Sequence, residues 1–312
     1  MIKKQLFGLF PKNKLGWNDL TSHHILIKDR IRTLSYKKAI DDSVKSDDVV
    51  LDIGCGTGIL SFFAAKKGCK KVYAVDKNDI IDCAKKTAEQ NNLDKNIEFV
   101  KIDILKFKPR EKIDVLIQEQ IGRYIWNDDL MRKVAYIRDN YLKHDGAIIP
   151  FKIELYLAPT NYRSFFEEQT SFWNRKQYGI DFSNISKAMF LQHIYCCRSP
   201  LPIELHNKET FLCKEKLFYT IDLRKDSKIP GELSASFRLK KNSTLTGMCC
   251  YFKVYLNERY TFSTVPRKIN TCWHQIFLPC SEKKVIKCNS ILNFTLFPQK
   301  KSKAWKFRFN IS

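Results

Sequence analysis

The sequence predicts an α/β unit with a parallel sheet, followed by an antiparallel β-barrel. Between residues 46 and 150, runs rich in β-branched residues alternate with helical patterns, which is typical of a parallel sheet covered on both faces. From about residue 210, short runs of alternating apolar and polar residues are separated by polar turns, which favours an antiparallel sandwich or barrel. The chain has 312 residues, more than one core usually serves, so we expect two domains.

The predicted elements follow one another in a regular order. Residues 1–45 precede the alternating pattern, and apolar spacing predicts one helix over residues 22–40. Four runs with strand character lie at residues 49–53, 71–76, 97–102 and 112–119. Helical patterns lie at residues 59–68, 79–92 and 128–142, and a further strand is predicted at 144–149, before Pro150 ends the unit. The second unit, residues 151–312, contains helical patches within about residues 160–195 before its strands begin.

The charge of the chain is high and uneven. The net charge is +22. Residues 1–150 hold 28 Lys/Arg and 21 Asp/Glu, a net of +7, and residues 151–312 hold 27 and 12, a net of +15. Two explanations stay open: a lysine-rich, solvated surface, or a basic face for an acidic or nucleic-acid partner such as RNA.

The cysteines and the apolar runs narrow the class of protein further. The eleven cysteines form no C-x-x-C pair, so we expect reduced thiols, no metal site and a cytoplasmic location, with the nucleus as the alternative. No run approaches the roughly 18 apolar residues that a membrane span needs, so we expect no membrane partner.

A glycine-rich turn is the strongest local signal. The strand at 49–53 leads into Gly54-x-Gly56-x-Gly58 and then into a helical pattern. This order is typical of sites for nucleotide-like cofactors, because glycine lets the backbone approach the ligand and a helix N-terminus offers free N–H groups. The next strand ends in Asp76, 24 residues after Asp52, near the spacing at which a carboxylate meets ribose hydroxyls. The third glycine comes one residue too early for a dinucleotide-binding turn.

The turn and its acids resemble the first motif of class I S-adenosylmethionine-dependent methyltransferases. The resemblance rests on the sequence DIGCGTG at residues 52–58, on the strand-end acid Asp76 and on Asp103 after the third strand. It implies a Rossmann-like domain over residues 46–150 and S-adenosyl-L-methionine as the cofactor. The alternative is a tight turn in a βαβ unit that binds nothing.

Four further segments resemble the protein arginine methyltransferases. QEQIGRYIWND at 118–128 resembles the family's double-glutamate loop, and residues 23–40 resemble its cofactor-capping helix. FWNRKQYGIDFS at 172–183 resembles part of its dimerisation arm, and NTCWHQ at 270–275 resembles the approach to its threonine-histidine-tryptophan loop. Because these matches occur in the family's order on both units, the chain is identified as a divergent member.

The resemblance implies a role for each candidate residue. Glu119 and Asp128 would be catalytic, gripping the guanidinium of a protein arginine that accepts the methyl group. Arg32 would hold the methionine carboxylate, since its planar fork matches a carboxylate, and His23 would close over the cofactor. The other implied cofactor contacts are Asp52, Gly54, Cys55, Gly56, Gly58, Asp76 and Asp103. The resemblance also implies a protein substrate with an exposed arginine and a homodimer.

The chain departs from the family pattern around the acceptor. The second glutamate is Asp128, which is one methylene shorter and is also a good N-cap for the following helix. Glu119 itself has the alternative role of capping the next element. Cys272 replaces the histidine that in the family pairs with an acid matching Asp29, and His274 could substitute if the segment is extended.

Two more departures keep other functions open. Gln120 stands where the family has tryptophan, and Trp17 is all that remains of a paired aromatic motif. The alternatives are therefore a methyltransferase of the same fold acting on RNA or another cationic acceptor, and a catalytically weak scaffold partner.

Overall fold

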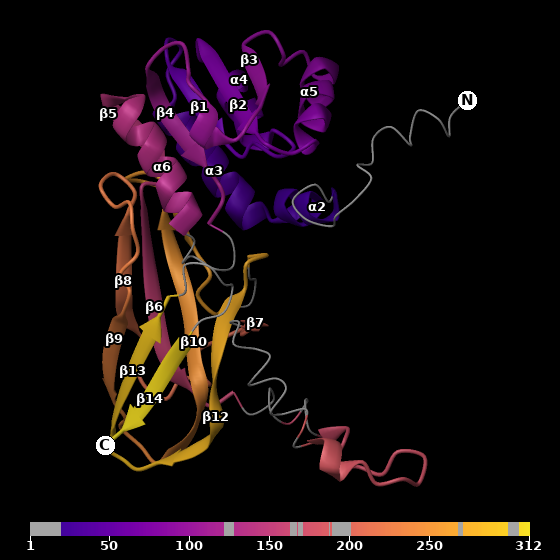
Figure 1. The fold of residues 1–312 in the computed structure, drawn as a ribbon, viewed down its shortest axis with the longest axis vertical. Helices are drawn as coiled ribbons and strands as arrows, with labels where there is room; N and C mark the ends of the chain where they lie inside the picture. Colours follow the sequence, from indigo (N-terminus) through magenta and orange to yellow (C-terminus); the bar gives the residue numbers. More distant parts are fainter. Residues whose placement is uncertain are drawn as a thin grey trace.

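A computed structural model describes most of the chain, namely residues 20–121, 128–162, 167, 171–186, 188, 201–267, 271–298 and 306–312, with the side chains of 128, 201–202 and 281–283 excepted. Trp17, the loop at 122–127 and much of the predicted arm at 160–195 lie outside these residues. The predicted fold class is confirmed: a parallel sheet with helices is followed by an antiparallel barrel region (Figure 1).

The first sheet has five parallel strands in the order β3-β2-β1-β4-β5. Its strands are β1 (Val49–Ile53), β2 (Lys71–Asp76), β3 (Ile97–Lys101), β4 (Ile113–Gln118) and β5 (Leu142–Ile149). The intervening helices are α4 (Ile59–Lys66), α5 (Ile80–Gln90), the short η1 (Ile104–Lys106) and α6 (Asp128–Asn140). All five residues of β1 are buried, as β-branched runs covered on both faces require. The glycine turn, Asp76 and Glu119 therefore meet at one edge, where parallel strands end.

The N-terminal helix is interrupted, so the prediction of one helix over 22–40 is wrong. The structure has α2 (Leu20–Lys28) and α3 (Arg30–Ser43), with Asp29 between them in an extended conformation. The Asp29 side chain accepts a hydrogen bond from the Arg32 backbone N–H at 3.0 Å and so caps α3. An aspartate at this place is a strong N-cap, which outweighs the continuous apolar spacing.

The strands described in the second unit form two antiparallel sheets. One runs β7-β12-β10-β6-β8 with β11 paired to β10, and the other runs β14-β13-β9. The strands of the larger sheet are β6 (Lys152–Thr160), β7 (Leu201–Ile203), β8 (Lys216–Asp222), β10 (Ser243–Tyr255), β11 (Thr261–Ser263) and β12 (Gln275–Ile286). Those of the smaller sheet are β9 (Leu233–Arg238), β13 (Ile291–Phe297) and β14 (Lys306–Ile311). Phe218 of β8 meets Phe294 of β13 at 6.0 Å between ring centroids, so the sheets share a core.

The last strand has one apolar and one charged face, as its alternating sequence predicts. Phe307 and Phe309 pack on the core around Phe294, while Lys306 and Arg308 are exposed. The aromatic side chains of this strand thus serve the barrel core.

The two units are joined by continuous packing. Tyr36 of α3 lies 6.1 Å from Phe262 of β11 between ring centroids, and both are fully or nearly fully buried. In Figure 1 the first unit sits above the barrel strands, with α2 and α3 beside the junction. Within the described residues, no helix has the length and apolar character that crossing a membrane requires, and no group of His, Cys, Asp and Glu side chains is arranged to hold a metal.

Candidate active site

The glycine turn forms a tight backbone cradle beneath α2. Gly54, Gly56 and Gly58 have φ values of 69°, 55° and 87°, in the left-handed region that side chains disfavour. A Cβ on Gly56 would lie 2.5 Å from Cε1 of His23, so the buried His23 ring packs directly on the turn. The structure therefore brings His23 and the glycines together, and their roles as cofactor contacts stay predictions.

Asp76 and Asp103 both bind backbone N–H groups at strand ends. Asp76 accepts from the N–H of Gly56 at 3.0 Å through Oδ2 and from that of Asn78 at 2.9 Å through Oδ1. Asp103 accepts from the Leu105 N–H at 3.0 Å and caps η1. Each carboxylate is held in a fixed place while keeping lone pairs for a further donor.

Asp52 and Cys55 lie beneath the turn. The buried Asp52 carboxylate accepts a hydrogen bond from the Ser61 hydroxyl at 2.7 Å. Burial raises the pKa of Asp52 to about 7, against the opposing effect of the Ser61 hydrogen bond. Burial also raises the pKa of the Cys55 thiol, which therefore stays protonated. In this structure the contacts of Asp52 support the turn from the side of α4.

Arg32 and Glu119 form a buried ion pair at the centre of the site. Nη2 of Arg32 donates to Oε2 of Glu119 at 2.6 Å, and the two side chains are 4% and 10% exposed. Nη1 of Arg32 donates to the Leu26 carbonyl at 3.0 Å and to the Thr33 hydroxyl at 3.2 Å. Burial alone would lower the pKa of Arg32, but the Glu119 carboxylate raises it above its ordinary value, so the guanidinium is charged.

Aromatic rings from both units enclose this ion pair. The Arg32 guanidinium lies 5.8 Å from the Tyr36 ring and 6.0 Å from the Trp273 ring, within cation–π range. The Tyr36 hydroxyl donates to the Gln118 carbonyl at 3.0 Å and so ties α3 to the end of β4. Sequence analysis missed Tyr36, although it follows Arg32 by one helical turn and so lies on the same face.

Two polar atoms of the ion pair remain open. Within the part of the chain that the structure describes, Nε of Arg32 is buried without a hydrogen-bond partner, and Oε1 of Glu119 has none either. Buried donors are normally satisfied, so the open Nε is the kind of atom that a bound carboxylate would complete. The glycine cradle and this open donor fit an S-adenosylmethionine whose methionine end points at Arg32.

The comparisons with known proteins cover both units. Residues 33–147 match the family described as ribosomal protein L11 methyltransferase (PrmA), and residues 152–311 match the arginine methyltransferase oligomerization subdomain. Protein arginine N-methyltransferase 1 of Dictyostelium discoideum is 30% identical over 282 residues, which cover 88% of this chain and 80% of that protein. The chain belongs to the protein arginine N-methyltransferase family.

Solved structures of the same family share the fold. Protein arginine methyltransferase 10 of Arabidopsis thaliana superposes with a TM-score of 0.79 at 23% identity, covering 95% of this chain and 93% of that one. The Trypanosoma brucei PRMT1 enzyme–prozyme heterotetrameric complex with AdoHcy gives 0.77 at 21% identity, covering 95% and 99%. Membership in the family places the chain among S-adenosylmethionine-dependent methyltransferases, which confirms the donor predicted from the glycine turn.

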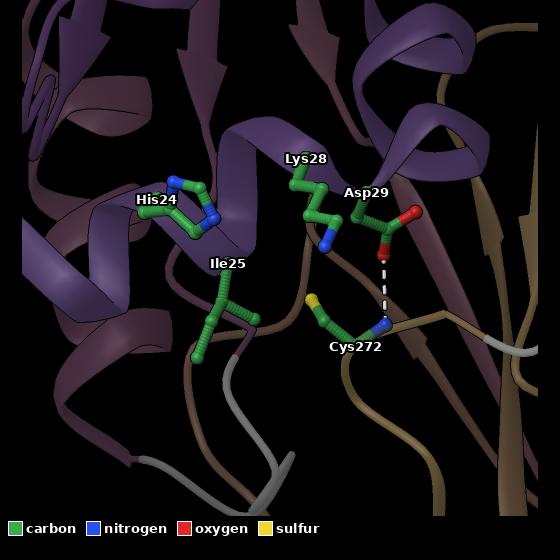
Figure 2. A pocket seen from close by; sticks show the side chains of 5 residues that line it. All are labelled: His24, Ile25, Lys28, Asp29 and Cys272. Atoms are coloured by element: carbon green, nitrogen blue, oxygen red, sulfur yellow. Dashed lines mark hydrogen bonds between the residues drawn. The ribbon is translucent and has the colours of Figure 1, made fainter.

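The family's histidine position is occupied by Cys272, which still contacts Asp29. The Cys272 backbone N–H donates to Oδ2 of Asp29 at 2.9 Å (Figure 2), while Oδ1 of Asp29 caps α3. Burial, and then the Asp29 carboxylate, raise the pKa of the Cys272 thiol to about 12, so the thiol is neutral. His274 closes a turn, with its N–H bonded to the Thr271 carbonyl and φ at 52°. The segment is therefore not extended, which was the condition for His274 to replace the missing histidine.

Gln120 packs against the glycine turn. A Cβ on Gly54 would lie 1.8 Å from Nε2 of Gln120, so the amide rests on the Gly54 backbone. Lys133 of α6 donates to Oε1 of Gln120 at 3.3 Å. An amide thus borders the predicted place of the methionine end, where the family has an indole.

Asp128 is the first residue of α6, and its side chain lies outside the described residues, as does the loop at 122–127. That the Asp128 carboxylate faces Glu119 therefore stays a prediction, and so does the alternative that Asp128 caps the N-terminus of α6.

Proposed function

We propose that this protein transfers a methyl group from S-adenosylmethionine to a guanidinium nitrogen of a protein arginine, with Glu119 and Asp128 as ligands of that guanidinium. The observation that carries the proposal is the state of Glu119. One of its oxygens already binds a guanidinium, that of Arg32 at 2.6 Å, and the other has no partner among the described residues. A carboxylate held in this way can accept hydrogen bonds from a second guanidinium.

The chemistry follows from the charge of the acceptor. A guanidinium is protonated at any working pH, so its nitrogens are poor nucleophiles. Carboxylates on one side of the group concentrate its positive charge there and leave another nitrogen richer in electrons. The donor supplies an electrophilic methyl on a sulfonium. As the nitrogen–carbon bond forms, the sulfur–carbon bond breaks with its electrons going to sulfur, and the methylated nitrogen then loses its proton.

The ion pair explains why a second carboxylate is needed. The charge of Glu119 is already compensated by Arg32, which the same site needs for the methionine carboxylate. An incoming arginine would therefore meet a nearly neutral pair and would bind weakly. Asp128 is the acid that the family pattern places opposite Glu119, and its charge would belong to the substrate alone.

A direct assay tests this proposal. The protein is incubated with methyl-labelled S-adenosylmethionine and cell extract, and the products are digested with nuclease and hydrolysed to amino acids. We expect labelled methylarginine that survives the nuclease and disappears with Glu119→Gln. Label on lysine or nucleic acid, with none on arginine, would contradict the proposal and favour a different acceptor.

A second candidate is a catalytically weak partner that retains the donor site. Gln120 favours it, because its amide lies on Gly54 beside the predicted methionine position. The neutral thiol of Cys272 favours it as well. Donor binding measured by calorimetry, without turnover in the isolated protein, would support this candidate. Turnover by the protein alone that Glu119→Gln removes would exclude it.

The arm supports a homodimer as the working assembly. Gln177 and Ile180 pair across a turn whose central residues, Tyr178 and Gly179, have positive φ. At this tip Tyr178 is 100% exposed, and Ile180 and Phe172 are also exposed. Exposed aromatic and aliphatic side chains at the tip of an arm favour insertion into a second copy. Light scattering of the wild type and of Tyr178→Ser/Ile180→Ser tests this; a monomeric wild type would contradict it.

A further inference from the structure

The smaller sheet of the barrel has a polar face that is open to solvent. Its other face packs on the core through alternate residues such as Phe237 and Phe294, which are fully buried. The outward side chains of the two flanking strands are hydroxyl, amide or cationic: Ser234, Ser236 and Arg238 of β9, and Lys306, Arg308 and Asn310 of β14. None of the three strands of this sheet contains an Asp or a Glu.

Two turns extend this basic face to one end of the barrel. The turn after β9 contains Lys240 and Lys241, and the turn before β13 contains Lys287; all three lysines are exposed. The turns are tied together, because the Asn289 N–H donates to the Leu239 carbonyl at 2.8 Å. In Figure 1 the C mark, which follows β14, lies at this end of the barrel, away from the first unit.

The positive charge of this surface is not compensated within the described residues. Six exposed cations lie on it, and the side chain of none forms an ion pair there: Arg238, Lys240, Lys241, Lys287, Lys306 and Arg308. The acid that borders the surface is Glu232, which directly precedes β9, so six cations and one carboxylate give a side-chain charge of +5. Adding Glu282 of β12, whose side chain lies outside the described residues, would still leave +4.

The cations of the larger sheet are arranged differently. Lys152 lies 3.2 Å from Glu154, and Lys208 pairs with Glu215. Glu154 also accepts a hydrogen bond from the Tyr255 hydroxyl at 2.7 Å. A general excess of lysine would leave unpaired cations on both sheets alike. Their segregation to the smaller sheet and its turns therefore favours an anionic partner at that surface.

We propose that this basic surface, made up of the six cations on β9, β14 and the two turns, binds single-stranded RNA through its phosphates. Unpaired Lys and Arg side chains provide the sequence-independent part of such binding. On the same face the hydroxyls of Ser234 and Thr295 lie 3.0 Å apart, and such groups can exchange this bond for one to a ribose 2′-hydroxyl.

The same face also offers a ring for the bases. The Arg308 guanidinium lies 6.0 Å from the centre of the Phe297 ring, and bases stack on aromatic and guanidinium planes. Hydroxyls and a stacking ring distinguish this surface from a purely basic one and favour RNA over an acidic protein. The inference goes beyond methyl transfer and does not depend on it.

Fluorescence anisotropy with a labelled RNA of about 16 nucleotides tests the surface, since sheet-based modules cover up to about this length. We expect a Kd in the range of about 1–100 µM at physiological salt, which is typical of binding through phosphates without sequence preference. Single-stranded DNA of the same sequence and polyglutamate of the same charge serve as competitors. Both should bind several-fold more weakly than the RNA.

Matched pairs of adjacent lysines locate the binding. Lys240→Gln/Lys241→Gln removes two charges from the basic surface, whereas Lys85→Gln/Lys86→Gln removes two from exposed positions of α5 in the first unit. Each phosphate contact adds about 0.7 to the slope of log K against log salt for single strands. The turn variant should therefore lower this slope by about 1.4 and weaken binding by about tenfold, and the α5 variant should change neither.

Lys306→Gln/Arg308→Gln tests the strand face separately and should resemble the turn variant. Circular dichroism and S-adenosylhomocysteine binding check that every variant is folded. Equal losses in the turn and α5 variants would overturn the inference, because binding would then follow overall charge. DNA or polyglutamate binding as tightly as the RNA would overturn the choice of RNA. None of these measurements uses methylarginine formation, so the proposed function can fail without this inference and the reverse.

Discussion

Two buried acids lie at the ends of neighbouring strands, and their surroundings differ. Asp52 lies near the end of β1 and accepts a hydrogen bond from the Ser61 hydroxyl. No cation contacts it among the described residues. Glu119 follows β4 and pairs with the Arg32 guanidinium. Burial without a cation raises the pKa of Asp52 to about 7, whereas the Glu119 carboxylate lies against the Arg32 guanidinium at 2.6 Å. Similar places in the sheet thus give one supporting acid and one suited to binding a cation.

The difference depends on α3 rather than on the sheet. Arg32 is placed by the helix break at Asp29, which caps α3 and contacts Cys272 of the barrel. The same helix contributes Tyr36, which bonds to the Gln118 carbonyl beside Glu119. Removing charge at Glu119 should therefore affect turnover, while removing it at Asp52 should affect the pH dependence of stability.

The largest expected effect comes from Glu119→Gln. This change keeps the shape of the side chain and removes the charge that pairs with Arg32 and that, in the proposed function, binds the substrate guanidinium. Removing one such electrostatic contact commonly lowers kcat by about 10²–10³-fold, and we expect a loss of at least this size in methylarginine formation. Glu98→Gln is the matched control, because Glu98 also pairs with a cation, Lys71 at 2.7 Å, on the surface of the same sheet. Similar losses in both variants would contradict a specific role for Glu119.

The next effect concerns Arg32→Lys. Lysine has one ammonium and cannot serve the Leu26 carbonyl, the Thr33 hydroxyl and Glu119 together. We expect the Kd for S-adenosylhomocysteine, measured by calorimetry, to rise by about tenfold or more, the equivalent of one charged hydrogen bond. Arg30→Lys makes the same exchange at an exposed position of α3 and should leave the Kd unchanged. An unchanged Kd in Arg32→Lys would show that Arg32 does not contribute to binding of the donor.

The fold was predictable because each element carries its own pattern. β-branched runs, the glycine turn and the alternating barrel strands all follow periodicities that packing enforces. The break at Asp29 had only a weak signal, a good N-cap residue inside a continuous helical spacing. The regular spacing of apolar residues predicts a continuous helix. Asp29 is also held by a hydrogen bond from Cys272, which is far away in the sequence, so local spacing does not report it.

The sequence predicts which residues belong to the candidate site better than it predicts the contacts between them. The strand-end acids and the glycine turn follow from topology, and the family resemblance adds Arg32 and Glu119. Their direct pairing spans 87 positions and depends on how α3 docks onto the sheet, which spacing does not report. The packing of Gln120 on Gly54 depends on a side-chain rotamer, for which the sequence carries no signal.

Asp52→Asn tests the other acid. Folding raises the pKa of Asp52 from an ordinary value of 3.8 to about 7, so the folded state holds a proton that the unfolded state has released between these pH values. The stability of the wild type should therefore fall as the pH rises from about 4 to about 7 because of this group. Asparagine does not titrate, so the variant should be more stable than the wild type at pH 8 by about 1–4 kcal/mol, with little difference at pH 4.

Urea unfolding at both pH values measures this difference, because the contributions of all other groups cancel between variant and wild type. We also expect Asp52→Asn to retain methyl transfer within a few-fold, unlike Glu119→Gln. A loss of turnover as large as that of Glu119→Gln would show that the two acids act together, and the contrast between them would fail.

The smallest effect is expected at Cys272. Its link to Asp29 is made by the backbone N–H, which any residue except proline supplies, and its thiol is neutral because burial and Asp29 raise its pKa to about 12. Cys272→Ser should therefore change the free energy of unfolding by about 0.5 kcal/mol or less and leave turnover within about twofold. Asp29→Ala removes both the cap of α3 and the acceptor for Cys272, and should cost about 1–2 kcal/mol. A Cys272→Ser loss as large as that of Asp29→Ala would mean that the thiol itself, and not the backbone, connects the barrel to the helix that carries Arg32.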